Sequence, residues 1–228
     1  MNTLHRLLAL PVLALTVATA HASTFANITV DGDFSEWAEV PSISLSFSND
    51  PEGGLNIANV KMANNATHLF IYVSFTSAVS ANGGPDTEGG PASGRSLIFG
   101  VDRDQNFSTG LNVFGVNRVG VEGTWVNDTG VDNLNGGSLS ANAGISPYYS
   151  STLGQEYSIS LGSLLSDNSA LFGAAGSSFA FAFYTSGNQP YEKLAVGSYT
   201  LSGIPEPSTY AALAGFGALT LAFFRRRR

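Results

Sequence analysis

The chain has 228 residues, of which 17 are acidic and 10 are basic, and its formal net charge is −7 at neutral pH. It contains no cysteine, which excludes disulfide bonds and thiolate metal sites. An acidic surface repels nucleic acids and anionic lipids and attracts cations, so we expect no nucleic-acid partner. The length is sufficient for one domain with a substantial core.

The first 22 residues have the organisation of a secretory signal peptide. Arg6 gives a basic start, residues 7–17 are mostly apolar, and Ala20-His21-Ala22 is a small-x-small cleavage site. The apolar stretch is too short to be a comfortable membrane span. We therefore predict a signal peptide over residues 1–22 and a mature body that begins at Ser23.

Apolar and polar residues alternate along the body, which is typical of strands rather than helices. Clusters of Gly, Asn, Ser and Pro separate the candidate strands. These strands are predicted at residues 43–47, 58–62, 69–75, 96–101, 112–121, 123–126, 157–161, 178–184 and 194–201. One short helical turn is expected within 163–172, and residues 77–95 are expected to form an exposed loop. The pattern predicts one all-β domain over residues 23–204, a single antiparallel β-sandwich.

Several segments of the body carry a resemblance in the same order as in a known family. They are Asp31-Gly32 followed by Trp37, His68–Val73, Leu97–Asp102 and Glu156–Leu161. Together they resemble family 9 carbohydrate-binding modules and the wider group of DOMON-like sandwiches, although Ser160 replaces the family's usual proline. The resemblance implies a jelly-roll-like sandwich, and it makes carbohydrate binding one expectation for function.

Aromatic residues have two competing interpretations. Trp37, beside the predicted Asp31-Gly32-Asp33 turn, is expected to anchor the core. Trp125 shares strand parity with two valines and is also expected to face inward, but we keep it as a candidate glycan contact. Tyr148 and Tyr149 follow a proline in a polar stretch and could stack on a sugar ring.

Residues 102–110 are rich in oxygen ligands for a hard cation. Asp102, Asp104 and Asn106 lie at alternate positions of a turning loop, and calcium accepts six to eight oxygen ligands. The segment lacks the full EF-hand pattern. An Asx-rich turn with Arg103 or Arg118 as counter-ion explains the same residues without a metal. Both interpretations stay open, and calcium is the only cofactor that we expect.

Catalytic residues are not evident in the body. His68 is the only histidine outside the signal peptide, and there is no cysteine to pair with it. The glycine pairs do not form a phosphate-binding loop between a strand and a helix. We therefore expect a protein that is not an enzyme.

The C-terminal end combines three features. Pro205-Glu206-Pro207 precedes an uncharged run over residues 210–224, and Arg225, Arg226, Arg227 and Arg228 end the chain. As a helix, residues 210–224 would reach about 22 Å, which is short of the roughly 30 Å hydrocarbon core. Arginine side chains can extend toward the headgroups, and the positive-inside bias keeps them cytoplasmic. We predict a marginal transmembrane helix with the body outside.

This order of features resembles the PEP-CTERM sorting signal of Gram-negative bacteria. The resemblance covers residues 204–228, with the signal itself predicted at 205–228. It implies recognition by exosortase, a membrane-embedded processing enzyme, with cleavage near Pro205-Glu206-Pro207 and delivery of the body to the cell surface or extracellular matrix. It also implies an association with exopolysaccharide and biofilm.

Removal of both ends makes the body more acidic than the whole chain. The sixteen acidic residues that remain outnumber five basic ones, a formal charge of −11 over residues 23–204; the basic residues are Lys61, Arg95, Arg103, Arg118 and Lys193. Two functions are therefore expected as alternatives. The first is a non-catalytic structural component of a surface polysaccharide layer, and the second is a carbohydrate-binding module for a defined glycan.

Overall fold

The computed structural model describes residues 23–48, 57–79, 97–113, 119–147, 152–185 and 194–203. These ranges contain strands and one short 3₁₀ helix, with no longer helix among them. In chain order the elements are β1 (Thr24–Phe25), η1 (Phe34–Trp37), β2 (Ser46–Ser48), β3 (Ile57–Asn64), β4 (His68–Val79), β5 (Leu97–Asp102), β6 (Leu111–Val113), β7 (Val119–Val121), β8 (Gly123–Val126), β9 (Thr129–Asp132), β10 (Gly144–Ser146), β11 (Thr152–Ser160), β12 (Ser178–Thr185) and β13 (Leu194–Thr200).

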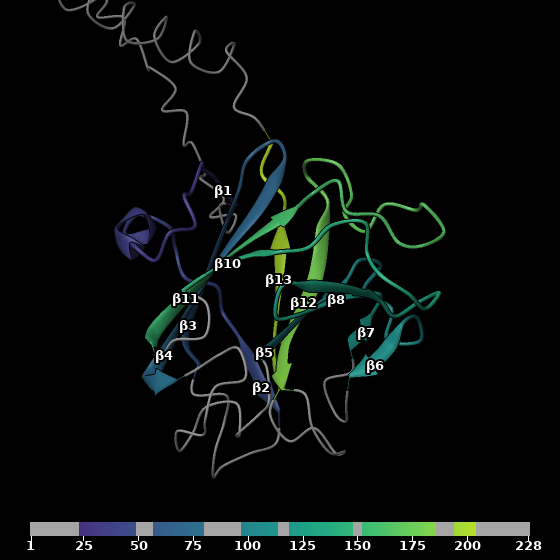
Figure 1. Cartoon of the computed structure of the whole chain (residues 1–228), viewed down its shortest axis with the longest axis horizontal. Helices are drawn as coiled ribbons and strands as arrows, with labels where there is room; N and C mark the ends of the chain where they lie inside the picture. Colours follow the sequence, from purple (N-terminus) through teal and green to yellow (C-terminus); the bar gives the residue numbers. More distant parts are fainter. Residues whose placement is uncertain are drawn as a thin grey trace, which may run out of the picture.

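The strands form two large sheets and one small one (Figure 1). The first large sheet has five strands in the order β1-β3-β4-β11-β10, and the second has six in the order β2-β13-β12-β5-β8-β9. Strands β6 and β7 pair with each other beside the second sheet. The all-β prediction is confirmed. The pairing is not wholly antiparallel, because β1 runs parallel to β3 with Thr24 opposite Ala63.

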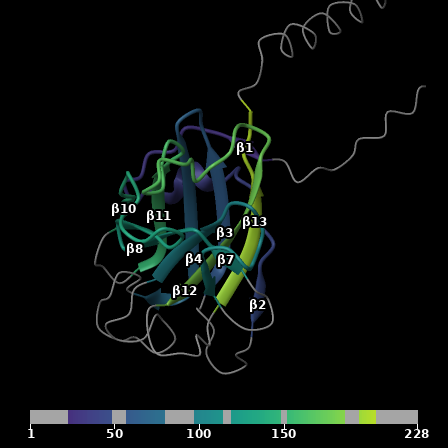
Figure 2. The ribbon, with the colours of Figure 1, turned by 90° about the vertical axis from the view of Figure 1, so that its right-hand side faces the viewer.

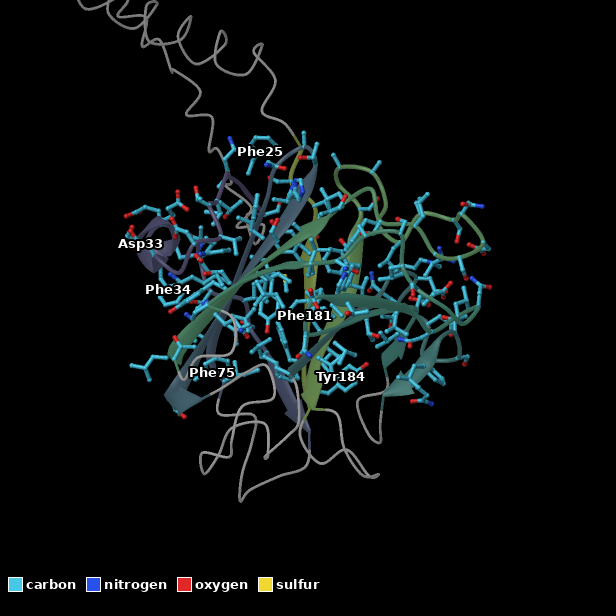
Figure 3. All side chains as sticks on the ribbon, in the orientation of Figure 1. Phe25, Asp33, Phe34, Phe75, Phe181 and Tyr184 are labelled. Atoms are coloured by element: carbon cyan, nitrogen blue, oxygen red, sulfur yellow. The ribbon has the colours of Figure 1, made fainter. Side chains whose placement is uncertain are left out.

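One hydrophobic core joins the two large sheets, whose layers are visible in the turned view of Figure 2. Alternate residues of β4 point into it, as the period of two requires: Leu69, Ile71 and Val73 are all 0% exposed. The second sheet contributes a cluster of rings in which Phe99 stacks near Trp125 and tilts against Phe181. Figure 3 shows Phe181 in the middle of the molecule. Burial of this apolar surface is the main stabilising contribution.

The N-terminal turn has the predicted local chemistry. The side chain of Asp31 accepts the backbone N–H of Asp33, and the side chain of Asp33 accepts that of Ser35, which starts η1. Asp33 and Phe34 lie on the outer flank of the first sheet (Figure 3). Trp37 is only 1% exposed, so its predicted burial is confirmed, and it packs in a second hydrophobic cluster with residues that include Val40, Ala63 and Phe70.

Glu156 of β11 connects this turn to the first sheet. Its carboxylate accepts the indole N–H of Trp37 at 2.7 Å and the backbone N–H of Gly32 at 3.0 Å. It also accepts the backbone N–H of Asp31. Burial raises the pKa of Glu156, and these hydrogen bonds to the charged form counteract the effect in part.

Two local predictions are wrong. A single strand over 112–121 was expected, but β6 and β7 are separate strands that pair as partners. A helical turn was expected within 163–172, but this segment forms a bridge between Leu164 and Ala170 instead. Asn168 has a positive φ of 65°, and Asp167 accepts the backbone N–H of Ser169, so turn chemistry overrides the apolar spacing.

Several predicted features lie outside the described residues. They are the signal peptide, most of the loop at 77–95, Arg118, Tyr148, Tyr149, and the C-terminal segment from residue 204 onward. In the part of the chain that the structure does describe, no helix has the length and apolar character needed to cross a membrane.

Candidate functional site

Three carboxylates converge beside the second sheet. Asp102 ends β5, Asp104 lies in the following loop, and Glu122 lies between β7 and β8. One carboxylate oxygen from each lies within 4.8 Å of the others. Asp102 is 3% exposed and Glu122 is 0% exposed, whereas Asp104 is exposed. Two of the three charges are therefore buried in a protein interior.

The strand pairing places these residues together. Val101 of β5 is opposite Gly123 of β8, and the backbone N–H of Glu122 donates to the carbonyl oxygen of Val101 at 3.0 Å. Residue 122 is thereby brought next to residue 102, although twenty positions separate them in the sequence. The contact is a consequence of long-range pairing rather than of the local loop.

Two glycines allow the loop to pack closely on β7. A Cβ on Gly120 would lie 2.3 Å from the carbonyl oxygens of both Asn106 and Thr109. A Cβ on Gly110 would lie 2.3 Å from the carbonyl oxygen of Val121, and Gly110 also has a positive φ of 68°. At both glycines the backbone of the loop lies directly against the backbone of β7, so only glycine allows this close approach.

Mostly backbone donors serve the three carboxylates. Asp102 accepts backbone N–H groups from Gln105, Gly120 and Asn106, and the Asn106 N–H is shared with Asp104 at 2.9 Å. Glu122 accepts the backbone N–H of Arg103 at 2.8 Å. The Thr109 hydroxyl lies 2.8 Å from Glu122 and 3.0 Å from Asp104. Since a hydroxyl has one proton, it can donate to only one of these acceptors at a time.

The electrostatic environment disfavours the charged forms. Burial raises the pKa of Asp102, and neighbouring Asp104 raises it further against the effect of backbone hydrogen bonds. Burial likewise raises the pKa of Glu122, with Asp104 and Asp102 adding to the shift. A proton or a cation at this position would relieve the repulsion.

The structure brings together part of the predicted calcium set. Asp102 and Asp104 meet, but the side-chain oxygen of Asn106 accepts the backbone N–H of Ser108 in an Asx turn. The side chain of Arg103, one of the two predicted counter-ions, donates to the Ser169 hydroxyl and the Ala170 carbonyl oxygen. Sequence analysis missed Glu122. Its signal was a carboxylate within the apolar run Val119–Val126.

One predicted glycan contact is contradicted. Trp125 is 1% exposed, its ring stacks on Phe172, and its indole N–H donates to the Ala141 carbonyl oxygen. A side chain enclosed in this way cannot stack on a sugar. The inward orientation expected from strand parity is therefore correct, and the assignment as a contact is wrong.

Asp132 is a further buried carboxylate, and its hydrogen bonds indicate a structural role. Burial would raise its pKa, but hydrogen bonds from Ser166, Asn135 and Leu134 outweigh that effect and lower it below the ordinary value of 3.8. The Ser166 backbone N–H donates at 2.7 Å, which ties the loop after β11 to the end of β9. This carboxylate has enough donors without a cation.

The C-terminal end of the body is held by Asn64, which is 1% exposed. Its side-chain oxygen accepts the backbone N–H of Ser202 at 2.7 Å and the hydroxyl of Tyr199 at 3.0 Å. Its side-chain N–H groups donate to the carbonyl oxygens of Ser202 and Asn65. The folded body is therefore fixed as far as Ser202.

Residues 203–228 match the PEP-CTERM protein-sorting motif. The match begins directly after Ser202 and includes Pro205-Glu206-Pro207 and the final arginines, so the predicted PEP-CTERM signal is confirmed. The PEP-CTERM motif implies export, processing by exosortase, and localisation at the cell surface or outside the cell. No curated protein and no solved structure matches the chain. The resemblance of the body to carbohydrate-binding and DOMON-like domains therefore stays a prediction.

Proposed function

We propose that this protein is a non-catalytic structural component of the extracellular polysaccharide layer of a Gram-negative bacterium. The observation that carries the proposal is the PEP-CTERM motif, which follows without a linker domain from a folded β-body. In this proposal the signal peptide of residues 1–22 directs export, the helix at 210–224 anchors the protein, and exosortase releases it. The sandwich, of DOMON-like or jelly-roll-like type, then functions in the matrix.

Calcium is proposed at the cluster of Asp102, Asp104 and Glu122. Carboxylate oxygens are ligands that calcium prefers, and one oxygen from each of these three carboxylates lies within 4.8 Å of the others, so a cation would relieve their mutual repulsion. The carbonyl oxygen of Asn106, 2.8 Å from the Thr109 hydroxyl, lies in the same loop and is a further candidate ligand. The ion would neutralise this part of an acidic body and would hold the loop of residues 103–110 on β7.

The sorting step is tested in the native host by replacing Pro205, Glu206 and Pro207 with alanine. Cells are fractionated, and the protein is followed with an antibody against the body. We expect the wild type in the extracellular fraction and the variant in the membrane fraction. Replacement of Ser208 and Thr209 by alanine is the matched control and should leave release unchanged. Normal release of the triple variant would overturn the assignment.

The calcium proposal is tested by thermal unfolding of the purified body with EDTA or with calcium. Binding at a concentration 100 times the Kd would stabilise the fold by about 2.7 kcal/mol, or roughly 5–10 °C in Tm for a domain of this length. The Asp102→Asn plus Asp104→Asn variant should lose this increase. The control is Asp31→Asn plus Asp33→Asn, which loses two charges elsewhere in the body. Its calcium-dependent increase in Tm should equal that of the wild type. No calcium-dependent shift in the wild type would exclude the site.

The alternative is a carbohydrate-binding module. One observation favours it, a hollow of about 340 Å³ between the segment 41–44 and the end of β13. Residues with hydroxyl groups and apolar residues both line this hollow; they include Ser42, Ser44, Ser198, Thr200, Met62 and Tyr199. Sugar-binding sites combine such groups.

A glycan array with the body, with and without calcium, distinguishes the two functions. Specific retention that is lost in Tyr148→Ala plus Tyr149→Ala, or in Ser42→Val plus Ser198→Val, would support the module. No retention on any glycan would exclude it and would leave the structural role.

A further inference from the structure

The end of the body from which the chain leaves is built around a close pairing of its two termini. The hydroxyl of Ser202 donates to the carbonyl oxygen of Ser23 at 2.9 Å, and the hydroxyl of Tyr199 donates to the carbonyl oxygen of Thr24 at 3.4 Å. Figures 1 and 2 show β1 and the end of β13 at the same end of the molecule. We call this region the exit end.

The connection between the exit end and the apolar C-terminal run is short. Only residues 203–209 separate Ser202 from Tyr210. Seven residues reach at most about 25 Å when fully extended, whereas a domain of this length is about 40 Å across. An anchor at 210–224 would therefore keep the exit end nearest to the membrane, because the body cannot turn its opposite end around on so short a connection.

The exit end also carries a hollow without charged residues. Its volume is about 510 Å³. Its walls come from the β3–β4 hairpin, the end of β11, the loop before β12 and the end of β13. The lining residues are Asn64, Asn65, Ala66, Thr67, Ser160, Leu161, Gly162, Gly173, Ala174, Ala175, Leu201 and Ser202. None of these residues is Asp, Glu, Lys or Arg. The loop lies directly beside the exit, since the backbone N–H of Gly176 donates to the carbonyl oxygen of Leu201 at 2.8 Å.

A charge-free surface is unexpected on a body with a formal charge of −11 over residues 23–204. Anionic lipid headgroups repel carboxylates that come within a Debye length, about 8 Å at physiological ionic strength. The short connection allows the exit end to enter this zone and keeps the opposite end of the body, about 40 Å away, outside it. Absence of carboxylates at this surface avoids the repulsion while the remaining surface stays acidic.

We propose that the exit end is a membrane-facing surface, which lies against anionic lipid headgroups while the C-terminal segment anchors the chain. The inference rests on the proposed function for the anchor itself. It adds an orientation: Asn64 holds the exit fixed, and the charge-free rim of Ala66, Ala174 and Ala175 faces the lipid. The three alanines are exposed, as contact with headgroups requires.

The orientation is measured with the full chain in vesicles of 70% phosphatidylcholine and 30% phosphatidylglycerol that contain a headgroup-attached quencher. Because the chain has no cysteine, Ala174→Cys gives one fluorophore position at the exit end. Thr76→Cys gives an exposed control position at the opposite end of β4. We expect at least about threefold stronger quenching at position 174. Equal quenching of protein that floats with the vesicles overturns the inference and leaves the anchor intact, whereas absence of flotation overturns both.

Charge substitutions test the electrostatic part. Ala66→Glu plus Ala175→Glu should lower quenching at position 174 by up to about tenfold in these vesicles and should have little effect in pure phosphatidylcholine. Ser46→Glu plus Leu153→Glu adds the same charge at the opposite end of the sheets and should change nothing. The neutral variant Ala66→Gln plus Ala175→Gln controls for side-chain size. A loss of quenching that is equal for the glutamate and glutamine pairs would contradict the proposal.

Discussion

Two buried carboxylates in this protein, Asp132 and Glu122, have opposite effects on stability when they are charged. The pKa of Asp132 is lowered because donors outweigh burial, so its charged form stabilises the fold above its ordinary pKa of 3.8. The pKa of Glu122 is raised because burial and two neighbouring carboxylates outweigh its donors. Burial, hydrogen-bond donors and neighbouring carboxylates together decide the difference, and sequence alone does not reveal them.

Replacement of Glu122 by glutamine is predicted to change the pH dependence of stability. A carboxyl group whose pKa is raised in the folded state binds protons more tightly there, so its contribution favours folding at low pH and is lost as the pH rises through the folded pKa. Without calcium, E122Q should therefore be more stable than the wild type at pH 7, by on the order of 1 kcal/mol. The difference should shrink as the pH falls toward 4.5, the ordinary value for glutamate.

Urea unfolding in EDTA from pH 7 to pH 4.5 measures this difference. Excess calcium should make the wild type the more stable protein at pH 7, because calcium binds the Glu122 carboxylate that the variant lacks. Glu36→Gln is a suitable control, since Glu36 is exposed and bonds locally to Thr29. A constant difference between E122Q and wild type across the pH range would contradict the assigned electrostatics.

At the scale of elements, the hairpin β6-β7 depends on close backbone contact with the loop after β5. Gly120→Ala is predicted to destabilise the protein by roughly 2 kcal/mol or more, because its Cβ would meet two carbonyl oxygens at 2.3 Å. Calcium-dependent stabilisation should be lost in the same variant. The control is Gly162→Ala, whose Cβ would have its nearest neighbour at 3.5 Å. Thermal unfolding with and without calcium measures both effects, and a stable, calcium-responsive G120A would contradict the described packing.

The turn before η1 is predicted to depend on Glu156. Glu156→Ala would leave the indole N–H of Trp37 and two backbone N–H groups without their acceptor, at a cost of about 2–4 kcal/mol. In a W125F background, the remaining Trp37 fluorescence should shift to longer wavelength at denaturant concentrations below global unfolding. Glu39→Ala is the control in this background. Trp37 emission that changes only together with global unfolding would show that the turn does not depend on Glu156.

Much of the fold follows from local patterns, whereas the site does not. Alternation predicted strands at β4, β12 and β13, and the Asp31-Gly32-Asp33 pattern predicted its own turn. The strand expected at 112–121 is instead the antiparallel pair of β6 and β7, because the chain reverses between Val113 and Val119, which the spacing of apolar residues does not reveal. Glu122 joins the cluster through pairing of β5 with β8, which depends on distant parts of the chain. The loop residues Asp102 and Asp104 were predictable because they are neighbours in sequence.

At the scale of the whole molecule, the main feature is the direct succession of an acidic folded body and the C-terminal motif. The body is fixed up to Ser202, and the PEP-CTERM match begins at residue 203. The predicted processing site at Pro205-Glu206-Pro207 is therefore close in sequence to the folded body. In the proposed processing the four terminal arginines are removed, so the delivered protein would be more acidic than its precursor.

Intact-mass analysis of the extracellular protein from the native host tests the central claim directly. The account predicts a body that begins near Ser23 and ends near Pro205-Glu206-Pro207, without Arg225–Arg228. The same analysis in a host that lacks exosortase should find only membrane-bound protein with the full C-terminus. Extracellular protein that retains the four arginines would contradict the account.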